Sequence, residues 1–79
     1  MISELELSGT ERVLDLGCGD GVLTLKLAEH LPHGEVVGID ASKGMIETAI
    51  LREKRNARFL EMDINYLSFA ESFDVVFSN

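Results

Sequence analysis

Residues 13–21, with the sequence VLDLGCGDG, constrain the fold more than any other part of the chain. An apolar run of the kind found in strands ends in Asp15, and glycines follow at positions 17, 19 and 21. Glycine is used where the backbone needs a positive φ or must come close to a ligand. We therefore expect a strand that leads into a turn with a ligand lying against it. Asp15 argues against a simple pyrophosphate ligand, because a buried carboxylate would repel phosphate but could hold an amine or a cation.

The size and composition of the chain limit the class of protein. Its 79 residues make at most one domain, and a domain this small buries only roughly 60% of its unfolded surface. The net charge of −7 opposes binding to nucleic acid phosphates. No apolar run is long enough to span a bilayer, and the single cysteine cannot form an internal disulfide. We expect no signal segment, because the first residues lack a basic and then apolar pattern. We expect a cytoplasmic protein that has no membrane partner.

The periodicity of the apolar residues predicts alternating strands and helices. Short apolar runs predict four strands, at residues 12–16, 35–39, 57–62 and 73–77. Helical spacing predicts two helices, at residues 21–31 and from 42 to about 54. This alternation indicates parallel pairing with right-handed crossovers, which is an α/β fold with a doubly wound parallel sheet.

Local signals mark the ends and the inner faces of the two helices. Asp20 and Ser42 are candidate N-caps, Pro32 with Gly34 ends the first helix, and Asn56 is expected in an exit turn. The apolar residues expected on the inner faces are Leu23, Leu27, Ala28 and Leu31 in the first helix, and Met45, Ile46, Ala49 and Ile50 in the second.

Polar residues follow each of the four predicted strands. In a doubly wound sheet, ligands sit beyond the carboxyl ends of the strands. The residues found there are Asp15, Asp40, Asp63 with Ile64, and Ser78 with Asn79. We therefore expect three carboxylates and an amide around one crevice.

Asp40 and Asp63 each have two possible roles. Asp40 could accept hydrogen bonds from the vicinal hydroxyls of a ribose or could cap the following helix, and its position 23 residues after Gly17 favours the ribose. Asp63 could accept a hydrogen bond from an exocyclic amine while the backbone N–H of Ile64 pairs with a ring nitrogen. Those two residues would then recognise an adenine edge, although Asp63 could also be a turn residue.

The other candidate residues carry weaker signals. Asp15 could hold the turn by accepting backbone N–H groups, or could meet a ligand ammonium directly or through water, and the two roles can coexist. Cys18 has no histidine beside it and is expected as a small turn residue rather than a nucleophile. Neither His30 nor His33 has the spacing of a metal ligand, so we expect no metal site.

A dinucleotide-binding turn is the main alternative for the glycine-rich segment. Its G-x-G-x-x-G pattern fits Gly17 and Gly19, but Val22 occupies the position of the third glycine. That glycine allows close packing of helix on strand, and the strand before a pyrophosphate turn is usually apolar to its end. Both Val22 and Asp15 therefore disfavour a nicotinamide-dependent oxidoreductase.

Four ordered motifs resemble the class I S-adenosylmethionine-dependent methyltransferases, in particular their small-molecule type. The motifs are VLDLGCGDG at residues 13–21, VGIDAS at 37–42 with Met45, FLEMDI at 59–64 and FDVVFSN at 73–79. The resemblance covers nearly the whole chain from about Glu11. It implies a Rossmann-like sheet whose strands follow the order 3-2-1-4, and S-adenosylmethionine as the cofactor, with S-adenosylhomocysteine as its product.

The resemblance also implies which residues bind this cofactor. They are Asp15, Gly17, Cys18, Gly19, Asp40, Ala41, Met45, Asp63, Ile64 and Asn79. In this set the glycine turn would contact the methionine moiety, Asp40 would hold the ribose diol, and the residues after the second and third strands would line the adenine. Asn79 would stand near the methionyl end. No residue of the segment is identified as a general base.

The family's domain continues after its fourth strand, which is interior in the full order 3-2-1-4-5-7-6. We therefore expect residues 1–79 to form a partial domain that lacks the C-terminal substrate half. Its exposed fourth strand would favour a dimer or a partner chain. The expected function is S-adenosylmethionine binding and methyl transfer to a small-molecule acceptor, with catalysis requiring the missing half. A non-catalytic subunit that completes a partner is the alternative.

Overall fold

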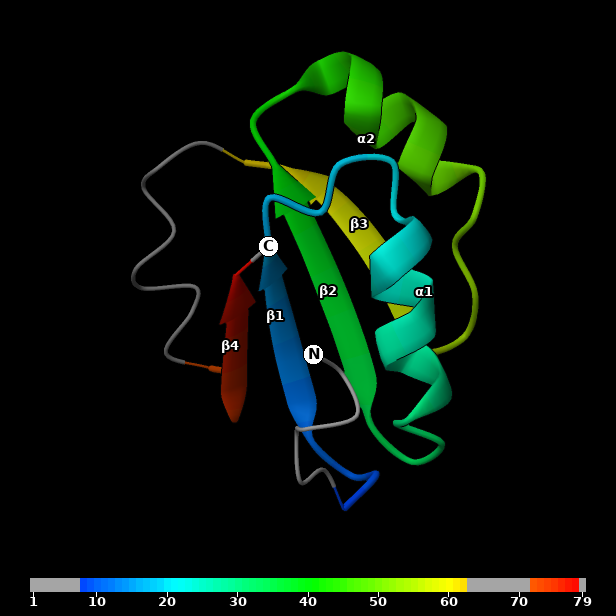
Figure 1. The fold of residues 1–79 in the computed structure, drawn as a ribbon, viewed down its shortest axis with the longest axis vertical. Helices are drawn as coiled ribbons and strands as arrows, with labels where there is room; N and C mark the ends of the chain where they lie inside the picture. The colour runs from blue at the N-terminus through cyan, green and yellow to red at the C-terminus, as the bar shows by residue number, and fades with distance from the viewer. Residues whose placement is uncertain (1–7, 63–71, 79) are drawn as a thin grey trace.

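Four parallel strands form one sheet, in the order β3-β2-β1-β4, in the computed structural model, which describes residues 8–62 and 72–78 (Figure 1). The strands are β1 (Arg12–Leu16), β2 (Glu35–Asp40), β3 (Ala57–Glu61) and β4 (Val75–Ser78), and the helices are α1 (Val22–Glu29) and α2 (Lys43–Ile50). The predicted α/β fold and strand order are confirmed. In the register of the sheet, Leu16 of β1 lies beside Ile39 of β2 and Ser78 of β4, so these three strands end at the same edge.

Both helices pack on one face of the sheet. Side chains alternate between the two faces of a strand, which places Val36 and Gly38 of β2 on the same face. On that face Val36 is buried with Leu27 of α1, and Phe59 of β3 is buried with Ala49 of α2. Figure 1 shows β4 at the edge of the sheet farther from the two helices.

A second cluster covers the opposite face of the sheet. Leu14, Val37 and Ile39 are buried there, with Met62 and Phe73 packed against them. Because both faces are covered, the central strands β1 and β2 are apolar over most of their length, as is typical of parallel sheets.

β4 lies at one end of the sheet that the described strands form. Among the described strands β4 pairs with β1 alone, and its Val76 is 47% exposed. The expectation that another chain pairs along this edge stays a prediction. No helix among residues 8–62 and 72–78 has the length and apolar character needed to cross a membrane.

The first helix begins at Val22, one residue later than predicted, and three of the four residues expected on its inner face, Leu27, Ala28 and Leu31, are buried. Its N-cap is Gly21 rather than Asp20, whose carboxylate instead accepts a hydrogen bond from the backbone N–H of Val22 at 3.2 Å. Leu23 is exposed, and the buried residue of this first turn is Thr24. Asp20 cannot be the N-cap because the left-handed backbone at Gly21, with φ of 90°, separates it from the helix.

The second helix is shorter than predicted and ends at Ile50. The next three N–H groups bond to carbonyls three residues earlier, a tightening that is common at helix ends, and Lys54 then pairs with Ala57. The expected inner positions Met45 and Ile50 are 48% and 46% exposed, which is a correction. Only Ile46 and Ala49 face the sheet, because so short a helix presents one narrow stripe to it.

The bounds of three strands differ from the predicted ones by one or two residues, whereas those of β1 are as predicted. β2 extends to Asp40, β3 ends at Glu61, and β4 begins at Val75 instead of residue 73. Phe73 does not continue the strand. It packs in the cluster on the opposite face and lies under the guanidinium of Arg12, whose Cζ is 4.7 Å from the centre of the ring.

Asn56 closes the end of α1 from a distant part of the chain. Its side-chain amide is buried and donates hydrogen bonds to the carbonyls of Ala28 and Leu31, both at 2.9 Å. Its own carbonyl accepts a hydrogen bond from the N–H of Val36 in β2. The residue expected in a simple exit turn therefore joins α1, β2 and the start of β3.

Replacing Asn56 should destabilise the fold measurably. In Asn56→Ala the carbonyls of Ala28 and Leu31 each lose one of two donors and keep a backbone N–H, so we expect a loss of about 1–2 kcal/mol in the free energy of unfolding. Urea unfolding of the chain measures this loss. Arg55→Ala removes an exposed hydrogen bond to Pro32 and is the neighbouring control, with an expected change of less than about 0.5 kcal/mol. Equal losses in the two variants would contradict the role of Asn56.

Gly21 should tolerate no side chain, whereas Gly44 should. A Cβ at Gly21 would lie 2.7 Å from Cζ of Phe59, and its φ of 90° is strained for other residues. Gly21→Ala is therefore expected to cost at least about 2 kcal/mol of stability. Gly44 of α2 faces open space, so Gly44→Ala should stabilise the chain by about 0.5–1 kcal/mol. Thermal unfolding of both variants tests this difference, and a neutral Gly21→Ala would contradict it.

Candidate functional site

The turn between β1 and α1 is built from glycines with left-handed backbone. Gly17, Gly19 and Gly21 have φ of 68°, 59° and 90°, values that glycine adopts without strain. The N–H of Cys18 bonds to the carbonyl of Ile39 at 3.0 Å, and the N–H of Gly21 bonds to the carbonyl of Cys18 at 3.1 Å. A Cβ added at Gly17 or Gly19 would meet no atom of residues 8–62 and 72–78 within 4 Å.

Asp40 ties this turn to the end of β2 and the start of α2. One oxygen of its carboxylate accepts a hydrogen bond from the N–H of Gly19 at 3.0 Å, and the other accepts from the N–H of Ser42 at 2.9 Å. Ser42 is the N-cap of α2, as predicted, and its hydroxyl accepts from the N–H of Met45 at 3.3 Å. The Asp40 side chain thus holds the glycine turn and the α2 N-terminus together and remains partly exposed.

Asp15 lies beneath the turn instead of beside it. Its side chain is fully buried between β1 and α1, and it accepts a hydrogen bond of 2.6 Å from the hydroxyl of Thr24. Burial raises the pKa of Asp15 to about 6, and the Thr24 hydroxyl opposes part of that rise. The structure shows this bond to a helix side chain, and acceptance of backbone N–H groups of the turn, one of the two roles expected from the sequence, stays a prediction. Direct contact of Asp15 with a ligand stays a prediction.

Cys18 is a packing residue at the centre of the turn. Cys18 is buried with Ile46 and Phe59. It also packs against Gly38 of β2, where an added Cβ would lie 2.8 Å from the Cβ of Cys18. Burial, followed by the negative charges of Asp15 and Asp40, raises the pKa of the Cys18 thiol to about 12. The thiol is therefore protonated at neutral pH. That Cys18 is not a nucleophile stays a prediction.

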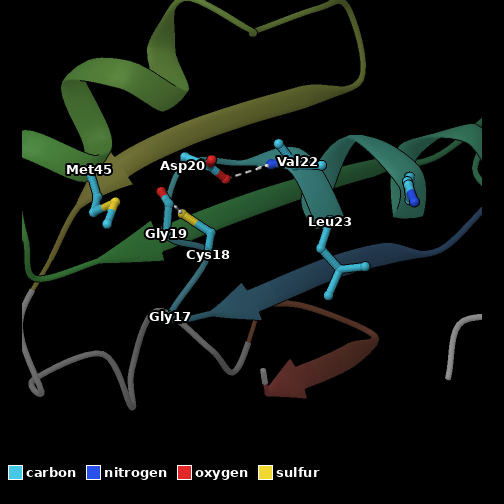
Figure 2. A pocket seen from close by; sticks show the side chains of 8 residues that line it. Gly17, Cys18, Gly19, Asp20, Val22, Leu23 and Met45 are labelled. Atoms are coloured by element: carbon cyan, nitrogen blue, oxygen red, sulfur yellow. Dashed lines mark hydrogen bonds between the residues drawn. The ribbon is translucent and has the colours of Figure 1, made fainter.

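An open pocket of about 460 Å³ lies over the glycine turn. Figure 2 shows the turn between Leu23 of α1 and Met45 of α2, which lie on its two sides. Among the described lining residues the charged side chains are Asp20 and Lys26. The full lining consists of Gly17, Cys18, Gly19, Asp20, Val22, Leu23, Lys26 and Met45. The exposure of Met45, which the helical pattern assigned to the core, follows from its position on this pocket.

The predicted site residues are thus brought together in part. Gly17, Cys18, Gly19 and Met45 line the pocket, and Asp40, which is followed by the exposed Ala41, is bonded to the turn. Asp15 supports the turn from below. The remaining predicted residues, Asp63, Ile64 and Asn79, lie outside the described part of the chain. In the described part, no three His, Cys, Asp or Glu residues are grouped as metal ligands would be.

Sequence reasoning missed Thr24. The residue occupies a buried position of α1 between apolar neighbours, and a polar residue on an apolar helical stripe is a signal that could have been noticed. Its bond to Asp15, nine residues away, could not be derived from the periodicity.

The buried carboxyl group of Asp15 predicts a particular pH dependence of stability. Its pKa is about 6 in the folded chain against an ordinary value of 3.8, so the folded chain holds this proton more tightly. The contribution of Asp15 to stability should therefore fall as the pH rises from about 4 to about 6. Asp15→Asn keeps an acceptor for Thr24 and does not titrate, so relative to the parent chain it should gain about 1–3 kcal/mol across this interval.

Urea unfolding in the same interval, on the parent chain and the variant, measures this difference. Asp20→Asn removes an exposed carboxylate from the same turn and should follow the parent chain. Parallel stability profiles for the parent and Asp15→Asn would contradict the assignment.

Comparison with known proteins identifies the family of this site. Residues 13–79 match the family described as methyltransferase domain. The chain is 43% identical over 68 residues to a trans-aconitate 2-methyltransferase of Deinococcus radiodurans, covering 86% of this chain and 26% of that protein. The chain thus spans about a quarter of the length of that relative.

Solved methyltransferase structures share the fold of this chain. An S-adenosylmethionine-dependent methyltransferase from Mesorhizobium loti superposes with a TM-score of 0.73 at 29% identity, over 96% of this chain and 35% of that one. The plantazolicin methyltransferase BpumL, solved in complex with SAH, gives a TM-score of 0.70 at 34% identity, over 85% of this chain and 26% of that one. With the glycine turn and the strand order already described, these matches show that the chain belongs to the class I S-adenosylmethionine-dependent methyltransferases.

Proposed function

We propose that the chain binds S-adenosylmethionine along the glycine turn and serves methyl transfer to a small-molecule acceptor. The observation that carries this proposal is the carboxylate of Asp40, which emerges from β2 and reaches the glycine turn that follows β1. A ligand that spans both features would place a diol at the Asp40 carboxylate. Another part of the same ligand would lie against the backbone of the glycine turn. An adenosyl group joined to a methionyl chain has both.

The glycine turn suits the methionyl end of such a ligand. Within the described part of the chain a Cβ at Gly17 or Gly19 would meet no atom within 4 Å, and the pocket above them continues toward Met45. The Asp20 carboxylate and the Lys26 ammonium, which line the pocket, offer charges of both signs, which fits a moiety that carries an ammonium and a carboxylate. We propose that the methionyl part of the ligand lies over Gly17 and Gly19.

Asp40 suits the ribose even though it already has two partners. Each of its oxygens accepts one backbone N–H, while an ionised carboxylate offers about four acceptor sites. The remaining sites can accept two vicinal hydroxyls. The cap role and the ribose role, posed above as alternatives, are therefore compatible in this geometry, and we keep the ribose role as a proposal.

The adenine would then lie toward α2. Ala41 is exposed directly after Asp40, and the half-exposed Met45 borders the pocket, so both can contact a flat apolar ring. Asp63, Ile64 and Asn79 keep the roles that the family resemblance implies, as proposals. The acceptor is proposed to be a small molecule on the example of the trans-aconitate methyltransferase.

The chemistry supplied by the bound cofactor is an electrophilic methyl group on a sulfonium. The residues of this chain contribute by holding the donor in one orientation, since alignment of donor and acceptor supplies much of the rate of such a transfer. A general base is needed only where the acceptor must lose a proton. We assign no described residue to that role.

Calorimetric titration of the chain with S-adenosylmethionine and with S-adenosylhomocysteine tests the proposed binding. Heat of binding is expected with both ligands. An absence of binding to either one by the folded chain would reject the proposed function.

The ribose role of Asp40 is tested by comparing S-adenosylhomocysteine with its 2′-deoxy analogue. The parent chain should prefer the hydroxylated ligand by about tenfold or more, because a hydrogen bond to a charged group is lost with the analogue. Asp40→Asn should lose most of this preference. Damage to the glycine turn would weaken the binding of both ligands equally. It therefore cancels in the ratio of their two dissociation constants. Asp20→Asn is the charge-matched control and should keep the preference, whereas an unchanged preference in Asp40→Asn would reject the ribose role.

A further inference from the structure

Thr24 is a polar residue in the buried side of α1. Its side chain has no exposed surface, and its neighbours on the same stripe, Leu27 and Ala28, are apolar. A hydroxyl in such surroundings is costly unless it is hydrogen-bonded. The Thr24 hydroxyl donates to Asp15 Oδ2 at 2.6 Å, so a bond between two fully buried side chains joins α1 to β1.

This bond encloses the whole glycine turn. Asp15 is the penultimate residue of β1, and Thr24 lies in the first turn of α1, so residues 16–23 form a loop whose two ends the bond connects. The bond from Gly19 to Asp40 holds the same loop from the β2 side. Glycines at positions 17 and 19 would allow this backbone several conformations, and these two contacts act with the backbone bonds of Cys18 and Gly21 to select one.

We propose that Thr24 is a positioning residue for the cofactor site, acting through Asp15 to hold the glycine turn in its ligand-binding shape. Thr24 does not line the pocket, and its hydroxyl points to Asp15 beneath the turn. Its effect on a ligand is therefore indirect and depends on the conformation of Gly17 and Gly19. The inference rests on the proposed function, because that function supplies the ligand. The effect on the turn rests on the observed bond between Thr24 and Asp15.

Three variants of the chain separate this role from general stabilisation. Thr24→Val has nearly the same shape and lacks the hydroxyl, whereas Thr24→Ser keeps it. Thr48→Val makes the same change on α2, where the exposed Thr48 hydroxyl donates to the carbonyl of Gly44 at 3.3 Å, away from the turn. Thr24→Ala replaces Thr24→Val if the latter does not fold.

Two measurements are made on each variant. Calorimetry gives the dissociation constant for S-adenosylhomocysteine, which should rise about tenfold in Thr24→Val and stay within about twofold in Thr24→Ser and Thr48→Val. Amide hydrogen exchange reports on the turn without any ligand. In Thr24→Val, the amides of Gly19 and Gly21 should exchange about tenfold faster relative to the amides of β2.

The outcomes distinguish this inference from the proposed function. If the parent chain binds and Thr24→Val binds equally well, the positioning role is overturned while the function stands. If exchange accelerates equally in the turn and in β2, Thr24 serves only the stability of the fold and the inference is overturned. If the parent chain does not bind, the proposed function fails and the cofactor part of this inference fails with it. Exchange at Gly19 and Gly21 then decides whether Thr24 positions the turn.

Discussion

Two backbone N–H groups, from Gly19 and Ser42, meet on the carboxylate of Asp40, and the form of the site depends on this contact. Gly19 belongs to the turn after β1, and Ser42 begins α2. β1 and β2 are parallel neighbours, so their carboxyl ends lie within reach of one side chain. A negatively charged acceptor makes stronger hydrogen bonds than a neutral one. One side chain thereby gathers the segments that would surround a nucleoside.

The aspartates at the ends of β1 and β2 differ because their surroundings differ. Asp15 turns toward the helices, where burial raises its pKa to about 6 and the Thr24 hydroxyl donates a hydrogen bond to it. Asp40 is the last residue of its strand, remains partly exposed and receives two backbone N–H groups. Asp15 is therefore suited to support the turn from within, and Asp40 is suited to meet hydroxyl groups of a ligand. The same residue type performs two tasks because the two strand ends provide different environments.

Local patterns predicted the strands better than the helix faces. A buried parallel strand is an almost continuous apolar run, so residues 12–16 and 35–39 were identified to within one residue of β1 and β2. An eight-residue helix presents only a narrow stripe to a sheet, and periodicity cannot say how wide that stripe is. Met45 and Ile50 were assigned to the core for this reason, yet both are exposed. The exposure of Met45 coincides with the pocket, where tertiary structure overrides the helical pattern.

The sequence by itself determined the α/β fold, the strand order through its family resemblance, and the glycine turn with Asp15 and Asp40 at the strand ends. These features follow from residue type and spacing along the chain. Only the tertiary structure decided that Asp15 bonds to Thr24, that Asp40 bonds to Gly19 and that Asn56 closes α1. Each of these contacts joins residues from different elements, nine or more positions apart. The physical reason is that a side chain's partner depends on how elements pack in three dimensions, and no local periodicity encodes that packing.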